Sequence, residues 1–265
     1  MRKICLLACA AVMAASLAAC TGADATPTAD PATPTPPADT LTISYGENAQ
    51  LELAAPTGER IFFDVWDPTA IAVPPTAQDI LLVTHLHADH YSQQFADSFP
   101  GQKIVNESGE LTAGTTKVVS IDASHDQTPI VPGDAANHIF IVEFAGWKIV
   151  HLGSTGQAEL TPEQKAAIGT DVDLAMGSFL DLGAADPSDS HEIDILDSIQ
   201  PKLVMYTHAR LENVQEAAER WTPVWSGKKA VTVPKSELTA ETTLLCMGRT
   251  GPSYGTILKA PEADW

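Results

Sequence analysis

Short apolar runs recur along the chain from Leu41 onward, and their pattern changes near the middle. In the first half the runs either alternate with polar residues or are continuously apolar, and Gly, Asn and Pro break them, which is typical of strands. Strands are expected over residues 41–46, 49–54, 60–67, 79–85, 103–108, 115–122, 138–145 and 147–153. Gly146 is expected to turn the last two into a hairpin, and one helix is expected over residues 91–99.

In the second half, helices alternate with strands. Thr161 as N-cap, Pro162 at the first helical position and Gly169 as a stop signal predict a helix over residues 161–169. Further helices are expected over residues 189–200 and 213–221, and strands over 172–177, 202–208, 228–234 and 242–248. A strand-rich first half followed by strand–helix alternation predicts a layered α/β fold with a mixed sheet or sheets.

The first 19 residues have the anatomy of an export signal peptide. Arg2 and Lys3 precede an uncharged apolar run over residues 4–19, which is shorter than the roughly 20 apolar residues that a membrane-spanning helix needs. The run ends in Leu17-Ala18-Ala19-Cys20, which resembles the lipobox of bacterial lipoproteins. That resemblance implies cleavage before Cys20, acylation of this cysteine, and a protein anchored in the cell envelope outside the cytoplasm. The alternative is an ordinary signal peptide in which Cys20 is accidental.

Residues 20–40 differ in composition from the rest of the chain, because they consist almost wholly of Thr, Ala, Pro and Asp. Such a segment cannot bury a core, and its prolines favour extended conformations. We therefore expect a tether over residues 20–40 that joins the lipidated Cys20 to a single domain over residues 41–265.

The chain is acidic, with 34 acidic and 15 basic residues. Loss of residues 1–19 would remove two basic residues and no acidic one, which changes the net charge from −19 to −21. Such a surface repels nucleic acid and anionic headgroups at long range, so no nucleic-acid partner is expected and the lipid alone would hold the protein to a membrane. Apart from Cys20, only Cys246 would remain, so no intrachain disulfide is expected.

The segment THLHADH, residues 84–90, places three histidines and an aspartate directly after an apolar run. His85 and His87 lie two apart in an extended segment, so their side chains point the same way, whereas Asp89 and His90 follow where the chain turns toward a helix. Imidazoles together with one carboxylate suit a borderline divalent ion such as zinc. A lone histidine is more often a core or surface residue, but this clustering after a strand indicates a metal site.

The same segment resembles the HxHxDH signature of the metallo-β-lactamase superfamily. The preceding FFDVWDP and DILLVTH are similar to the strand–Asp–Pro and strand–metal-loop elements of that superfamily. The likeness extends over about Leu41 to Gly248 and is greatest to the lactonase-like branch typified by L-ascorbate-6-phosphate lactonase. It implies an α/β fold of the αββα sandwich type, in which two facing mixed β-sheets carry outer helices and a metal site lies at one edge of the sheets.

The resemblance also implies six metal ligands in two sets of three. They are His85, His87 and His125 for the first ion, and Asp89, His90 and His208 for the second. Of these, His125 comes from the segment IDASHDQ after an expected strand, and His208 is the last residue of KLVMYTH. Zinc is the expected cofactor, with one ion bound tightly and a second ion or another divalent metal left open.

The chain departs from the family pattern at one metal position. The family places a bridging aspartate in a segment like HxGDTG, whereas this chain has HLGSTG with Ser154 at that position. A serine hydroxyl is a poor ligand and no anion at pH 7, so the site could hold one ion, hold two ions without a protein bridge, or keep only a binding pocket. Asp126, Asp181 or His191 could also substitute as a ligand, although surface positions for the acids and a helix N-terminal position for His191 are favoured. The family's GHxS loop is also altered, to YGENAQ over residues 45–50.

Two functions follow from these residues. The first is a lipid-anchored, extracytoplasmic metal-dependent hydrolase of a small-molecule substrate, such as a lactone or another ester, which uses a zinc-bound hydroxide. Asp89 would be its catalytic residue, because it would orient the attacking water or accept its proton. The alternative is a non-catalytic lipoprotein that binds a metal or a ligand on the same scaffold, which Ser154 favours. The six intact ligand positions favour the hydrolase.

Overall fold

A computed structural model describes residues 37–125, 128–180 and 191–248 of the chain. The expected export signal, most of the tether, Cys20, Asp126 and Asp181 lie outside these residues. The described residues belong to one compact unit. No helix among the described residues has the length and apolar character needed to span a membrane.

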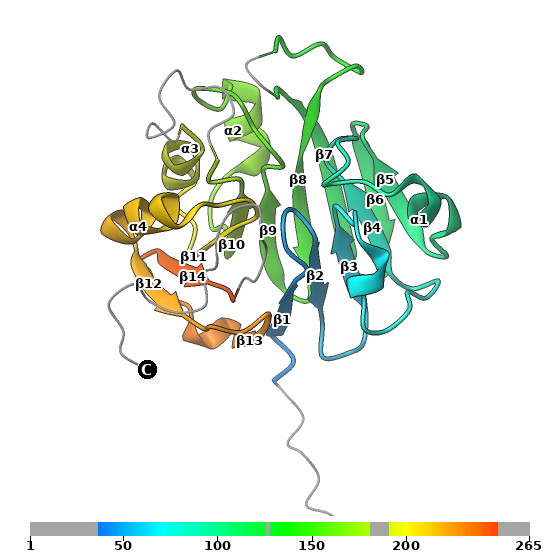
Figure 1. Cartoon of the computed structure of the whole chain (residues 1–265), viewed down its shortest axis with the longest axis horizontal. Coiled ribbons are helices and arrows are strands. Elements are labelled where there is room, and N and C mark those ends of the chain that lie inside the picture. The colour runs from blue at the N-terminus through cyan, green and yellow to red at the C-terminus, as the bar shows by residue number, and fades with distance from the viewer. Residues whose placement is uncertain (1–36, 126–127, 181–190, 249–265) are drawn as a thin grey trace, which may run out of the picture. The chain divides into compact units, whose positions relative to one another are not determined.

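The described residues form two β-sheets that face each other (Figure 1). The first sheet has the strand order β13-β1-β2-β3-β4-β5. Its strands are β1 (Thr40–Tyr45), β2 (Leu51–Ala54), β3 (Arg60–Phe63), β4 (Ile80–Val83), β5 (Gln102–Val105) and β13 (Ala230–Pro234). Strands β3, β4 and β5 run parallel and the other neighbours antiparallel, so the sheet is mixed.

The second sheet has the strand order β12-β14-β11-β10-β9-β8-β7-β6. Its strands are β6 (Gly109–Ala113), β7 (Thr116–Ala123), β8 (Asn137–Phe144), β9 (Trp147–His151), β10 (Leu174–Gly177), β11 (Leu203–Tyr206), β12 (Thr222–Trp225) and β14 (Thr243–Cys246). Strands β9, β10, β11, β14 and β12 run parallel to one another, whereas β6 to β9 form an antiparallel meander.

Helices lie on the outer side of each sheet (Figure 1). They are α1 (Gln93–Ser98), α2 (Pro162–Ile168), α3 (His191–Ile199) and α4 (Leu211–Arg220), with short 3-10 turns at Pro68–Ala70 and Lys235–Glu237. Helix α1 packs beside the first sheet, and α2, α3 and α4 lie on the side of the second. The expected αββα sandwich with two mixed sheets is therefore confirmed.

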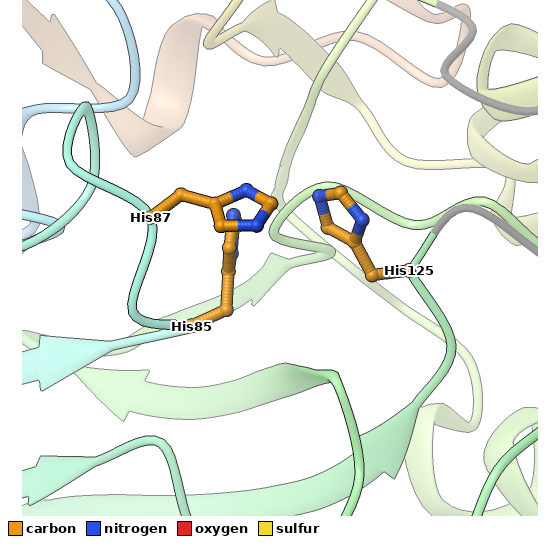
Figure 2. Close-up of side chains that lie close together, drawn as sticks. All are labelled: His85, His87 and His125. Carbon is orange, nitrogen blue, oxygen red and sulfur yellow. The ribbon is translucent and has the colours of Figure 1, made fainter. Parts of the chain in front are cut away.

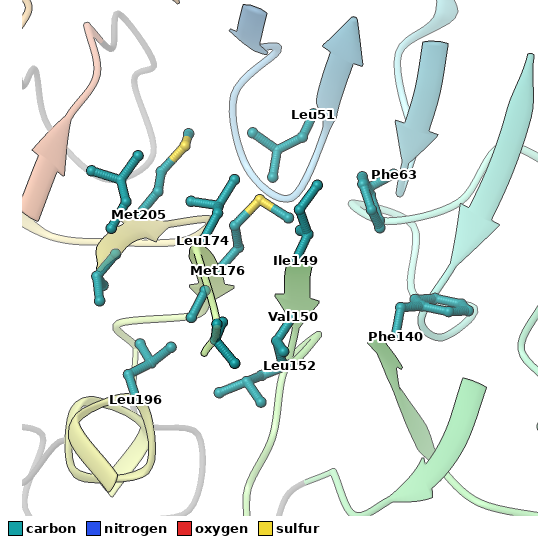
Figure 3. Close-up of a cluster of buried hydrophobic side chains, with 14 of the residues drawn as sticks. Leu51, Phe63, Phe140, Ile149, Val150, Leu152, Leu174, Met176, Leu196 and Met205 are labelled. Atoms are coloured by element: carbon teal, nitrogen blue, oxygen red, sulfur yellow. The ribbon is translucent and has the colours of Figure 1, made fainter. Parts of the chain in front are cut away.

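The continuous apolar run in β4 is explained by burial on both faces of the sheet. Ile80 and Leu82 point into the main core between the sheets, whereas Leu81 and Val83 pack with Phe99 in a second cluster on the outer side, next to α1. Strands buried on both faces lose the polar–apolar alternation of half-exposed strands. The main core includes Leu51 and Phe63 from the first sheet, and Phe140, Ile149, Leu174, Met176 and Met205 from the second (Figure 3).

Local sequence signals agree with the observed element ends. Thr161 caps α2 with a complete capping box to Gln164, and Gly169 ends the helix with a φ of 62°. Phe144 pairs with Trp147 across a two-residue turn in which Ala145 and Gly146 have φ values of 51° and 78°.

Two strands were absent from the sequence expectation. Strand β6 has mostly exposed or half-exposed residues and β12 contains Pro223, and both lie at an edge of the second sheet. Edge strands of this kind carry little apolar periodicity and tolerate proline, so their sequences did not stand out.

Candidate metal centre

All six candidate ligands lie beyond the carboxyl ends of strands, at one edge of the two sheets. His85 to His90 follow β4, His125 follows β7, and His208 follows β11. Strands β7, β9, β10 and β11 run in the same direction, because β7 and β9 are both antiparallel to β8 and β10 is parallel to its two neighbours. Their carboxyl ends therefore meet at one edge, which is where open α/β sheets bind ligands.

His85, His87 and His125 form the first cluster (Figure 2). One ring nitrogen from each lies within 4.8 Å of those of the other two. The ring centroids are 4.7 Å apart for His85 and His87, 4.8 Å for His85 and His125, and 4.6 Å for His87 and His125. His85 and His125 are buried, whereas His87 is exposed, so this cluster opens to solvent on the His87 side.

Asp89, His90 and His208 form the second cluster. The Nε2 atoms of His90 and His208 are 2.9 Å apart, and Asp89 Oδ2 lies 3.9 Å from His208 Nε2. The two histidines are buried, whereas 44% of the Asp89 side chain is exposed. The two clusters adjoin, because the ring centroids of His85 and His90 are 3.8 Å apart.

A buried carboxylate, Asp64, contacts His90 of the second cluster directly and His85 of the first cluster through Thr84. Asp64 is fully buried directly after β3, and its Oδ1 accepts a hydrogen bond of 2.7 Å from the Thr84 amide. Its Oδ2 accepts from Thr84 Oγ1 at 2.9 Å and lies 2.9 Å from His90 Nδ1. A carboxylate only accepts, so the proton of His90 sits on Nδ1, and the lone pair on Nε2 faces the second cluster.

Thr84 fixes the tautomer of His85 in the same way. Its hydroxyl proton goes to Asp64, so its oxygen accepts from His85 Nδ1, 3.0 Å away. The lone pair of His85 therefore lies on Nε2, a buried atom with no hydrogen-bond partner among the described residues. Networks of this kind fix the tautomer and orientation of histidines that bind metals.

Ser154 lies beside the second cluster. It is 1% exposed, and its Oγ is 3.3 Å from His90 Nε2. Asn137 Oδ1 accepts from the Ser154 amide at 3.2 Å, and Asn137 Nδ2 donates to Leu152 O at 2.8 Å, so this buried amide holds the whole turn after β9. Gly153 has a φ of 70°, and a Cβ there would lie 2.2 Å from Asn137 Oδ1, so glycine is required.

His151 is a buried histidine that belongs to neither cluster. It stacks on Phe63 at 4.9 Å, and its Nδ1 accepts from the Gly153 amide at 2.9 Å. Burial lowers the pKa of His151 to about 4, although Asp64, 3.9 Å from its Nε2, acts in the opposite direction. His151 is therefore neutral at pH 7 and serves the packing of this turn.

The donors of both clusters fit a divalent ion. Burial lowers the pKa of His85 far below its usual value, and the neighbouring His90, His125, His87 and His208 lower it further, so this imidazole stays neutral. A neutral imidazole with a buried lone pair is suited to act as a metal ligand. The chemistry of these donors suits zinc or another borderline divalent metal and does not choose between them.

Of the three possible substitute ligands, His191 alone lies among the described residues. His191 begins α3 and belongs to neither group of metal-competent residues among those described. Asp126 and Asp181 fall in the segments that are not described.

The altered loop over residues 45–50 lies beside His208. Tyr45 Oη donates to Thr207 O at 2.5 Å, and Trp66 Nε1 donates to Glu47 O at 3.2 Å. Glu47 and Asn48 both have positive φ values, 71° and 49°, which form the tight turn before Gln50. Tyr45 thus ties the start of this loop to the residue that precedes His208.

Asp64 and Asn137 are positioning residues to which sequence reasoning gave no role. Asp64 belongs to the FFDVWDP segment that carried the family resemblance, and its signal was an acid placed directly after an apolar strand. Asn137 had no comparable signal, because its role comes from the pairing of β7 with β8, which sets it opposite Ala123.

Comparison with known proteins places this architecture in a family. A family model described as "Beta-lactamase superfamily domain" matches residues 30–208, a range that includes all six candidate ligands. A search of curated proteins gives no match.

Solved structures share the fold. One is from Thermotoga maritima and its description assigns it to the metallo-β-lactamase superfamily; it has 20% identity and a TM-score of 0.55 over 77% of this chain and 98% of that chain. Another is the metallo-β-lactamase-fold protein YhfI from Bacillus subtilis, with 10% identity and a TM-score of 0.50 over 78% of this chain and 97% of that chain. At these identities the likeness concerns the fold.

Proposed function

This chain belongs to the metallo-β-lactamase superfamily, and from that premise we propose that it is a metal-dependent hydrolase of a small-molecule substrate. The observation that supports the proposal is the meeting of two three-residue donor clusters at one sheet edge. The Asp64–Thr84 network behind them directs the lone pairs of His85 and His90 into the clusters. Such orientation is needed to bind a metal ion.

The first cluster would hold the tighter ion, since its three imidazoles need no bridging carboxylate. Asp89, His90 and His208 would hold a second ion more weakly. A bound divalent ion such as zinc polarises a carbonyl or phosphoryl oxygen and makes water reactive near neutral pH. Asp89 belongs to the second cluster and is partly exposed, and we propose that its Oδ2 orients the attacking water and accepts its proton.

We propose a lactone or another ester as the substrate, because the THLHADH segment and the strands before it resemble those of the lactonase-like branch of the superfamily. We also propose that a lipid on Cys20 anchors the protein in the bacterial cell envelope, outside the cytoplasm. Leu17-Ala18-Ala19-Cys20 supports this location, and the tether up to residue 40 would hold the domain away from the membrane.

A second candidate is a lipoprotein that binds a metal or a ligand without catalysis. Ser154 favours it, because a neutral hydroxyl stands beside the second cluster.

Metal removal combined with a substrate panel separates the two candidates. The purified protein would be assayed on chromogenic lactones and esters before and after chelation, and again after zinc is restored. Hydrolysis that chelation removes and zinc restores supports the hydrolase. His87→Ala should lose it, whereas His191→Ala, the same substitution outside both clusters, should keep it. Zinc binding without hydrolysis of any compound would favour the second candidate, and hydrolysis that His87→Ala leaves intact would contradict the proposed site.

A further inference from the structure

Of the three candidate ligands in the first cluster, His125 alone comes from the second sheet. His85 and His87 follow β4 of the first sheet, and His125 faces them from beyond the end of β7 (Figure 2). The pairing of β7 with β8 ends at Ala123 and Asn137, so His125 lies two residues past the last paired position. Its position relative to the other two imidazoles therefore depends on contacts other than the hydrogen bonds of the sheet.

The turn after β9 supplies such contacts to Ser124, the residue that precedes His125. The Gly156 amide donates to Ser124 O at 3.1 Å, and the Ser124 amide donates to Gln157 Oε1 at 3.1 Å. The His125 amide donates to Thr128 Oγ1 at 3.3 Å, but Thr128 lies in the same loop and moves with it. The bonds from Gly156 and Gln157 are thus the ones that tie the backbone leading into His125 to another element.

The side chain of Gln157 is itself held by a second buried amide, Gln164 of α2. Gln157 Nε2 donates to Gln164 Oε1 at 2.8 Å, and Gln164 Nε2 donates to Gln157 Oε1 at 2.9 Å. Gln157 Nε2 also donates to Glu159 O at 2.9 Å. Gln164 Nε2 also donates to Asp122 O at 2.9 Å, and Gln164 Oε1 accepts from the Thr161 amide at 2.9 Å. Each amide thereby uses both N–H groups and accepts twice, so only one orientation of the pair satisfies every partner.

Helix capping does not account for Gln157. The capping box of α2 consists of Thr161 and Gln164, and Gln157 is not part of it. A buried amide costs free energy unless it is hydrogen-bonded, and the oxygen of Gln157 meets this need at the Ser124 amide. The contact that distinguishes Gln157 from a capping residue is therefore the one that leads to His125.

We propose that Gln157 is a positioning residue for metal binding, and that its paired amide with Gln164 holds His125 within reach of an ion at His85 and His87. The proposal rests on the proposed metal site and adds α2 to the elements that shape it. Networks around the ligands commonly fix how those ligands face the ion, and their loss weakens metal binding. Here the constraint acts through the backbone of Ser124.

Zinc affinity, measured by competition with a chelator, tests this role. Gln157→Met keeps an unbranched side chain of similar length and removes the amide. We expect zinc to bind about tenfold more weakly, at the lower end of the effect of supporting contacts. Thr161→Ala is the matched control, because it removes the hydroxyl that accepts from the Gln164 amide at 3.2 Å but leaves the two glutamine side chains paired. It should lower stability in urea and keep the wild-type zinc affinity.

A second measurement follows His125 in the metal-free protein. Diethylpyrocarbonate modifies accessible imidazoles, and mass spectrometry of the digested protein gives the rate at each histidine. His125 is 5% exposed and His85 is 2% exposed, so both should react slowly in the wild type. In Gln157→Met, His125 should react several-fold faster while His85 stays slow. Gln164→Met removes only the partner amide and should change both measurements in the same direction, which keeps the test available if Gln157→Met does not fold.

Three results would overturn the proposal. They are wild-type zinc affinity in the folded glutamine variants, an equal loss of affinity in Thr161→Ala, and an equal rise in the reactivity of His85 and His125, which would indicate general loosening. Absence of zinc binding by the wild type would instead count against the proposed function. The reactivity of His125 would still decide whether Gln157 positions it, because that measurement needs no metal.

Discussion

Asp64→Asn should separate the orienting role of Asp64 from its role in folding. The substitution keeps the side-chain volume and tolerates the φ of 48° at this position, because asparagine is among the residues that adopt left-handed backbone readily. The amide oxygen can still accept from the Thr84 amide. The amide nitrogen, however, is a donor and would face Thr84 Oγ1 and His90 Nδ1, two groups that the carboxylate now accepts from.

The expected loss of metal affinity follows from the change of tautomer. With a donor facing it, His90 Nδ1 must become an acceptor, which moves the proton to Nε2 and removes the lone pair from the second cluster. Thr84 Oγ1 would accept from the asparagine and could then donate to His85 Nδ1, with the same consequence for the first cluster. Loss of such supporting contacts typically weakens metal binding by about 10–100-fold, or about 1.4–2.7 kcal/mol.

The expected loss of stability is separate. Two hydrogen bonds to a charged oxygen, each contributing about 1.5–3 kcal/mol, would be replaced by neutral ones of about 0.5–1.5 kcal/mol. The metal-free variant should therefore unfold with a free energy lower by about 2 kcal/mol.

Two assays measure these effects independently. Urea unfolding of the metal-free protein gives the stability change, and competition with a chelator gives zinc affinity. Asp173→Asn is the control, because it also converts a buried carboxylate to an amide but lies before β10, at the end of the sheet away from the histidines. It should lose stability and keep zinc affinity. If Asp64→Asn loses stability while its zinc affinity stays at the wild-type value, Asp64 does not orient the ligands.

Three further predictions concern other parts of the chain. Burial alone would raise the pKa of Asp173, but hydrogen bonds from Lys202, Lys235 and the Lys148 amide hold it below its usual value; because the folded pKa is the lower one, the stability that these contacts provide is present above about pH 4 and is lost as the pH falls through the folded pKa. Urea unfolding between pH 7 and pH 2 tests this assignment. Asp173→Asn should be less stable than the wild type by about 1–2 kcal/mol at pH 7, and this difference in unfolding free energy should shrink as the pH falls. A difference that stays constant with pH would refute the assignment. Burial raises the pKa of the Cys246 thiol to about 12. In a protein that lacks residues 1–34, a thiol reagent at pH 8 should therefore leave Cys246 unmodified in the folded state and modify it in urea. Rapid labelling of the folded protein would contradict the burial of this thiol. Cys20→Ser should give uncleaved precursor or protein released from membranes, as detected by fractionation, whereas maturation and fractionation like the wild type would rule out the anchor.

The sequence predicted the parts of the molecule whose signals are local. The THLHADH segment contains four of the six donors, and apolar strands immediately precede His85 and His208. Each of these residues could be placed at a strand end, and parallel strands bring such ends together. The helix over Pro162–Ile168 was predictable for the same reason, because its cap, its proline and its terminal glycine are adjacent in sequence.

The features that were not predicted depend on distant pairing. Asp64 lies 26 residues from His90, and only the parallel pairing of β3 with β4 brings its carboxylate behind that ring. Asn137 holds the turn at Ser154 because β8 lies between β7 and β9. Neither arrangement has a periodic signal, since each involves a single polar residue at the end of a strand: Asp64 directly follows β3, and Asn137 begins β8.

The central claim is that His85, His87 and His125 form the tighter metal site of this protein. The most direct test is the zinc-to-protein ratio of the purified wild type, His87→Ala and His208→Ala proteins, measured by elemental analysis after dialysis against a weak chelator in a buffer free of carboxylates. We predict one retained ion per chain in the wild type, none in His87→Ala, and one in His208→Ala. Retention of the ion by His87→Ala, or equal loss from both variants, would contradict the account.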